Sequence, residues 1–78
     1  MKIVLTGKMK KTREQETAEF TRYGITVQKA VSGKTDFLVT GDAPGWTKIA
    51  AAKSKGVTVI QEDDFFNMLV EDYPEVLL

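Results

Sequence analysis

Three residues in the sequence have the types and the placement that phosphate binding requires. Thr6 and Gly7 end a short apolar run, and Lys48 lies near the start of a helix-forming segment. In an open parallel sheet, ligands bind beyond the carboxyl ends of the strands. If the strands before these residues are neighbours, a hydroxyl, a backbone N–H and an ammonium meet beside the positive end of a helix, which suits an anion. The alternative stays open at this point: Thr6 and Gly7 merely close a strand, and Lys48 is solvated.

Two further motifs resemble ligand sites but fit local structure better. Residues 33–35 read Gly-Lys-Thr, as at the end of a nucleotide-binding P-loop, but Gln28 occupies the position of that motif's first glycine and a strand rather than a helix follows. Residues 62–64 are three consecutive acids, which would point in different directions from a helix start and complement its dipole. They lack the alternate-residue spacing of a calcium loop. We therefore expect a polar turn and a helix start, and no metal site.

Trp46 has two readings of equal weight. It lies between a glycine-rich loop and the start of a helix. It is either an exposed platform on which a ring can stack or a cap over the hydrophobic core.

Composition narrows the classes of function. The chain has 78 residues and contains no cysteine and no histidine, which removes thiol nucleophiles, histidine triads and most zinc sites. Eleven basic residues balance eleven acidic ones, but all the bases lie between Lys2 and Lys55, and six of the acids follow Gln61. Such an asymmetry can place a basic face on a neutral protein. No apolar run approaches the length of a membrane span and no signal peptide precedes the first strand. A binding module is favoured over an enzyme.

The elements that must position these residues follow the order β-α-β-β-α-β-α. We expect strands at 2–6, 25–27, 37–40 and 57–60, and helices beginning near Arg13 and covering 48–53 and 62–70. Thr12 and Gln15 form a capping-box pattern before the first helix. Strands that alternate with helices favour a mainly parallel sheet with helices on both faces. The short link between the second and third strands is compatible with either a hairpin or a parallel pair.

Taken together, these segments resemble a BRCT domain. The resemblance runs from Lys2 to about Val70 and is most specific between Val31 and Lys48. It is greatest to the BRCT domains of bacterial NAD-dependent DNA ligases and of the large subunit of replication factor C. The matching segments, in order, are KIVLTG, RE, YGITV, VSGKTDFLVTGDAPG, TK, GVTVI and EDDF.

The resemblance implies an α/β fold with a four-stranded parallel sheet of strand order 2-1-3-4. Two helices, the first and third, would lie on one face and the second on the other. It also implies that Thr6, Gly7 and Lys48 bind phosphate. Many family members have tryptophan in the third helix, where Phe65 or Phe66 takes the core position here. We expect one domain over 1–78, with its core at about 2–70 and an acidic C-terminal tail at 71–78.

The first functional hypothesis is a non-catalytic module that recognises a DNA 5′-phosphate at a nick or recessed end, in replication or repair. Candidates to follow the DNA backbone are Lys8, Lys10, Lys11 and Arg13, and Trp46 would stack on a terminal base. So few contacts predict micromolar, strongly salt-sensitive binding.

The second hypothesis is a protein-interaction or scaffold domain. It would bind a phosphoprotein, associate with itself, or dock to a ligase or another replication partner through an apolar helix face. An exposed patch among Phe65, Phe66, Met68 and Tyr73 would favour it.

Neither hypothesis needs a catalytic residue, a cofactor or a metal, and neither involves a membrane. We expect an intracellular location, cytoplasmic in a bacterium or phage and nuclear in a eukaryote.

Overall fold

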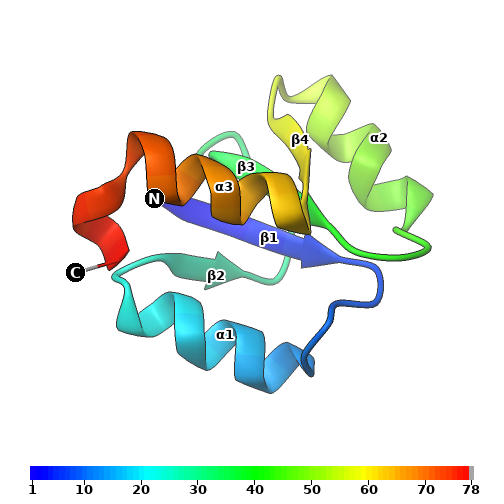
Figure 1. Cartoon of the computed structure of the whole chain (residues 1–78). Coiled ribbons are helices and arrows are strands. Elements are labelled where there is room, and N and C mark those ends of the chain that lie inside the picture. The colour runs from blue at the N-terminus through cyan, green and yellow to red at the C-terminus, as the bar shows by residue number, and fades with distance from the viewer. Residues whose placement is uncertain (78) are drawn as a thin grey trace.

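The four apolar runs form one parallel sheet (Figure 1). The computed structural model describes residues 1–77 of the chain. Its strands lie in the order β2-β1-β3-β4, and every neighbouring pair is parallel. This confirms the predicted topology and resolves the link between β2 and β3 in favour of a parallel arrangement. The elements in chain order are β1 (Lys2–Thr6), α1 (Arg13–Arg22), β2 (Thr26–Gln28), β3 (Phe37–Thr40), α2 (Trp46–Ser54), β4 (Thr58–Gln61), α3 (Glu62–Asp72) and the short 3-10 helix η1 (Pro74–Leu77).

Two strands begin one residue later than the pattern predicts, for the same reason. Gly24 and Gly56 end α1 and α2 with positive φ angles of 78° and 71°. In each case the next residue still belongs to the helix end, because its N–H donates back to a helix carbonyl: Ile25 to Phe20 at 2.9 Å, and Val57 to Ala52 at 2.8 Å. β2 and β4 therefore start at Thr26 and Thr58.

The two helix layers bury separate sets of side chains, as strand alternation requires. Ile3, Leu5 and Val39 face α1 and α3, whereas Val4 and Leu38 face α2. On the first face Phe20 of α1 packs against both Phe65 and Phe66 of α3, with its ring centroid 5.6 and 5.5 Å from theirs. Phe65 is fully buried and occupies the core position that the resemblance left between the two phenylalanines. The predicted placement of two helices on one face and one on the other is confirmed.

The loops that follow β1 and β3 are held together beyond the sheet. Lys8 and Asp42 exchange backbone hydrogen bonds of 2.7 and 2.9 Å, and the Gly41 N–H donates to the Thr6 carbonyl at 2.9 Å. A Cβ on Gly41 would lie 2.3 Å from the Lys8 carbonyl oxygen, so only glycine fits there. These backbone hydrogen bonds hold the loop after β1 against the segment that leads into α2.

Candidate phosphate-binding site

The three predicted phosphate ligands lie together at the carboxyl end of β1. Thr6 pairs with Thr40 of the neighbouring β3, so the chain leaving β3 leads directly to α2. The Thr6 hydroxyl accepts a hydrogen bond from the Gly45 N–H at 3.0 Å. Lys48 reaches back from the first turn of α2, and its Nζ donates to the Leu5 carbonyl at 3.2 Å. Lys48 is half-buried, and its ammonium contacts the backbone of β1.

Two glycines allow the loops to pack closely around this end of the strand, where Thr6 is buried. Gly7 has a φ of 85°, and a Cβ there would lie 2.6 Å from the Asp42 carbonyl oxygen. Gly45 would place a Cβ 3.3 Å from the Thr6 hydroxyl oxygen, close enough to crowd that group. Gly7 is therefore required by the fold itself, whereas Gly45 keeps side-chain atoms away from the Thr6 hydroxyl.

The ammonium of Lys48 lies in an environment that disfavours its charge. Burial lowers the pKa of Lys48 below its usual value, and the positive charge of Arg13 lowers it further. Among the described residues Lys48 forms no ion pair, and its acceptor is a neutral carbonyl. A partly buried cation without a counter-ion is unfavourable, and a bound anion would relieve this.

The start of α2 differs from the starts of the other two helices. α1 has the predicted capping box, with reciprocal Thr12 and Gln15 bonds of 3.1 and 3.2 Å, and acids in its first turn. α3 begins with three acids. α2 has Gly45 as its N-cap, no side-chain cap and no acid in its first turn. Its N-terminal N–H groups and its dipole are therefore not offset by the helix's own residues.

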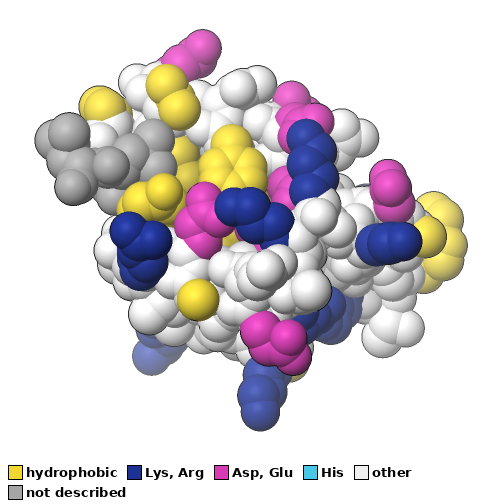
Figure 2. Space-filling view, turned by 60° about the horizontal axis from the view of Figure 1, so that its bottom comes forward, with side chains coloured by type: hydrophobic (Ala, Val, Ile, Leu, Met, Phe, Trp, Pro, Cys, Tyr) yellow, Lys and Arg dark blue, Asp and Glu magenta, His cyan; other side chains and the backbone are white. Residues whose placement is uncertain are grey.

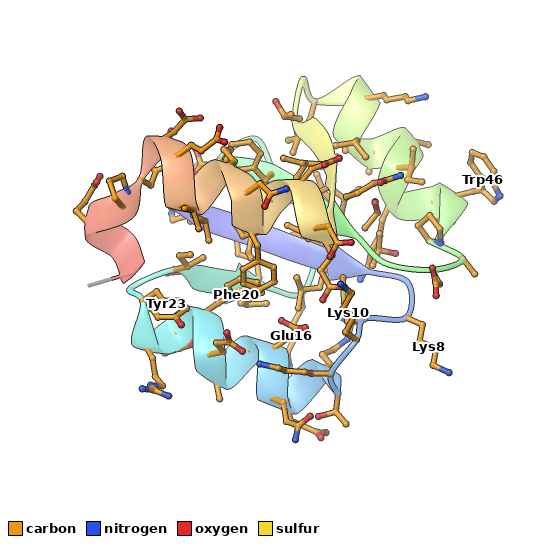
Figure 3. All side chains as sticks on the ribbon, viewed as in Figure 1. Lys8, Lys10, Glu16, Phe20, Tyr23 and Trp46 are labelled. Carbon is orange, nitrogen blue, oxygen red and sulfur yellow. The ribbon has the colours of Figure 1, made fainter. Side chains whose placement is uncertain are left out.

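Trp46 is the first residue of α2 and is 81% exposed, so it does not cap the core. Its ring projects away from the helix (Figure 3). Lys8 also points away from the molecule, from the loop after β1 (Figure 3). Both side chains are therefore open to an approaching ligand.

The other basic candidates are engaged with acids. Lys10 donates to Asp63 of α3 at 2.6 Å, and Lys11 pairs with Glu19 of α1. The hydrogen bond to its acid raises the pKa of each lysine. On the face that carries α1, basic and acidic side chains lie side by side and form no continuous basic surface (Figure 2). The positive charge of Arg13, at the start of α1, instead lowers the pKa of Lys48.

The two motifs that resembled ligand sites have local roles, as predicted. Residues 33–35 lie in a turn in which the Thr35 hydroxyl donates to the Gln28 side chain at 2.7 Å and accepts from the Ser32 N–H at 3.0 Å. Residues 62–64 form the first turn of α3. Within residues 1–77 no cluster of acids has the arrangement of a metal site.

The apolar face of α3 is turned inward. Phe65 is buried, and Phe66 and Met68 are half-buried and pack on the core. Tyr73 is 36% exposed, and Val70 farther along the helix is 60% exposed. The patch that would have favoured the protein-docking hypothesis is therefore mostly absent. No helix in the described part of the chain is long and apolar enough to cross a membrane.

The structure contains two buried carboxyl groups that the sequence patterns did not predict. Glu16 of α1 and Glu62 of α3 are only 2% and 7% exposed. Glu16 lies four residues before the core residue Phe20, and this helical spacing places it on the buried face. Acidic residues early in a helix are normally interpreted as surface residues that offset the dipole, so the burial of Glu16 was not predicted from this spacing.

Comparison with known proteins matches the chain with one family. The model of the BRCA1 C Terminus (BRCT) domain matches residues 1–69. A DNA ligase of Helicobacter pylori (strain P12) is 41% identical over 69 residues, which is 88% of this chain and 10% of the ligase. DNA ligases of Halorubrum lacusprofundi and Ruthia magnifica are 38% and 40% identical over 68 residues, each covering 87% of the chain.

The chain thus spans about a tenth of the length of these ligases. The family match agrees with the observed sheet order and helix placement. The segments of these relatives that match are parts of DNA ligases, and the chain belongs to the BRCT domain family.

Proposed function

We propose that this domain is a non-catalytic module that binds the 5′-phosphate of a DNA end in replication or repair, inside the cell. The observation that carries the proposal is the convergence of the Thr6 hydroxyl and the Lys48 ammonium at the uncapped start of α2. The relatives are named DNA ligases, and this name identifies DNA as what those proteins act on.

The donors at this site fit a phosphate group. The Thr6 hydroxyl accepts from Gly45, so its own proton remains to be donated. Lys48 has three N–H donors and uses one on the Leu5 carbonyl. Gly7 adds a backbone N–H with no side chain beside it. A phosphate placed here would also neutralise the repulsion between Lys48 and Arg13.

Two exposed side chains favour a nucleic acid as the carrier of the phosphate. Trp46 offers an exposed ring in the same first turn of α2 as Lys48, and a base stacked on an aromatic side chain contributes about 1–3 kcal/mol. Lys8 points away from the molecule from the loop after β1 (Figure 3). Lys10 and Lys11 would have to exchange their acids for DNA phosphates, so they add less. We expect micromolar affinity that weakens steeply with salt.

The test compares two forms of one recessed duplex, with and without the 5′-phosphate, by fluorescence anisotropy across a salt series. The domain should prefer the phosphorylated duplex, and Lys48→Glu should abolish that preference. Lys53→Glu is the matched control, because it makes the same charge change in the last turn of the same helix. It should lower affinity for both duplexes equally and keep the preference.

Equal binding of the two duplexes by the unaltered domain would contradict the proposal. Absence of binding to both would also contradict it, and would direct attention to a phosphoprotein or another protein partner.

A further inference from the structure

The carboxyl groups of Glu16 and Glu62 face each other between the starts of α1 and α3. Glu16 points from α1 toward α3 (Figure 3). Glu62 is among the groups that raise the pKa of Glu16, after burial, so the two buried carboxyl groups act on each other. One oxygen of each, Oε2, is buried and has no hydrogen-bond partner among the described residues. Neither residue takes part in the phosphate site.

Two ionised carboxylates are unfavourable in this buried position, where neither Oε2 has a hydrogen-bond partner among the described residues. A carboxylate only accepts hydrogen bonds, so a bond between the two groups requires a proton on one of them. Like charges that share a buried site also repel strongly, which favours retention of one proton. The neighbouring charges do not remove the need for it: Lys11 is paired with Glu19, and Lys10, which faces Glu62, is paired with Asp63.

We propose that Glu16 and Glu62 share one proton and form a pH-sensitive clamp that joins the start of α1 to the start of α3. When the proton leaves, two buried carboxylates repel each other, and the contact between the two helix starts weakens. Residues 8–12, which lead into α1 and contact α3 through Lys10, loosen with it.

The pH range of the clamp follows from its surroundings. Burial, followed by the hydrogen bond and charge of Glu62 and the charge of Glu19, raises the pKa of Glu16 from 4.5 to about 7, while Lys11 opposes the rise. A carboxyl group whose pKa is raised in the folded state binds more protons when folded than when unfolded. Its contribution to stability is therefore complete below pH 4.5 and is lost as the pH rises toward about 7.

The experiment measures the folding equilibrium constant by urea unfolding at intervals from pH 5 to pH 8. In the unaltered protein it should fall with rising pH, by at most roughly tenfold per pH unit for one proton. In Glu16→Gln the amide donates permanently to Glu62, so the dependence should largely disappear. Glu19→Gln removes a nearby acid outside the pair and should retain the slope. Glu62→Gln serves as a second test if Glu16→Gln does not fold.

Two readouts separate the clamp from a merely structural contact. Carbon NMR should show one glutamate carboxyl titrating near neutral pH, and hydrogen exchange at residues 8–12, corrected for its intrinsic pH dependence, should accelerate above that point. Titration of all glutamates near their ordinary value would overturn the proposal. So would stabilisation at pH 8 by magnesium chloride beyond matched sodium chloride in the unaltered protein but not in Glu16→Gln, because a cation would then hold the pair together.

Discussion

The starts of α2 and α3 lie at the same edge of the sheet but have opposite chemistry. Each helix follows a strand, β3 in one case and β4 in the other, and strand-end positions of this kind are where open parallel sheets bind ligands. At the start of α2 a partly buried lysine has no counter-ion in the described part of the chain, and an indole ring is exposed. At the start of α3 three acids offset the dipole, and Asp63 holds Lys10.

This difference shows that the fold supplies the position and that a few residues decide its use. A helix start becomes a site for an external anion only where the chain leaves its N–H groups and a nearby cation unsatisfied. The start of α3 also lacks a side-chain cap, but its acids offset the dipole and its nearby cation, Lys10, is paired with Asp63. We therefore expect changes near α2 to alter phosphate binding and changes near α3 to alter only general affinity or stability.

Gly7→Ala should have the largest effect, because it disrupts the packing of the loop after β1 against the loop that leads into α2. The new Cβ would lie 2.6 Å from a backbone oxygen and force a side chain into a φ of 85°. We expect a loss of about 2–4 kcal/mol in the free energy of unfolding, measured with urea. Gly24→Ala is the control, since it has a similar φ of 78° but open space around it. It should cost only about 1–2 kcal/mol, and equal losses would show that the approach of the loops does not matter.

Lys48→Glu should have the next largest effect and act on binding. It removes a charge-assisted hydrogen bond worth about 1.5–3 kcal/mol and adds repulsion. We expect at least a tenfold loss of affinity for a phosphorylated end, and for the unphosphorylated one only the smaller loss that Lys53→Glu also causes. Isothermal titration calorimetry would measure both, and a loss of the same size for both ends would assign Lys48 to general attraction.

Replacing the same residue with arginine would sharpen its role. Burial and Arg13 lower the pKa of Lys48, so its ammonium loses its proton at a lower pH than an ordinary lysine. Phosphate binding should therefore weaken in alkaline buffer below pH 10.5. Lys48→Arg should retain binding there because guanidinium stays charged. A parallel loss in both proteins would point to a different titrating group.

Trp46→Ala should weaken binding of DNA ends by about 1–3 kcal/mol if a base stacks on the ring. The side chain is 81% exposed, so the free energy of unfolding should barely change. Phenylalanine at this position should restore part of the affinity. Anisotropy against one phosphorylated duplex would show this order, and unaltered binding by the alanine variant would remove the ring from the interface.

Asp63→Asn should have the smallest effect and the opposite sign. It frees Lys10 from its ion pair, so affinity should rise slightly for both the phosphorylated and the unphosphorylated duplex. The same anisotropy series measures it at low salt, where such contributions are largest. A gain confined to the phosphorylated duplex would mean that α3 also contributes to phosphate selection.

The elements and their order follow from local signals in the sequence. The capping box at Thr12 and the glycine stops at Gly24 and Gly56 act within a few residues, so pattern reading located the helices closely. Strand boundaries shifted by one residue because the helix ends retain Ile25 and Val57. The sheet order depends on contacts between distant segments, and it was predicted only through the resemblance to a known family.

In the candidate site, too, local patterns predicted some features, whereas others depend on contacts between distant segments. Thr6, Gly7 and Lys48 were identified from their types and their places at the ends of elements. The pairing of Lys10 with Asp63 joins residues 53 positions apart, and no local pattern reveals it. The Glu16–Glu62 contact was hidden for the same reason. The exposure of Trp46 was open until the neighbouring layers were in place, because a ring at a helix start can fold inward or outward.

Amide NMR of the isotope-labelled domain, titrated with a short duplex bearing a recessed 5′-phosphate, tests the contrast between the two helix starts most directly. The account predicts that the largest shifts occur at Thr6, Gly7 and residues 45–48, and that they shrink when the phosphate is removed from the same duplex. Residues 62–64 should shift little with either duplex. Largest shifts at 62–64, or shifts at 6–7 and 45–48 that do not depend on the phosphate, would contradict it.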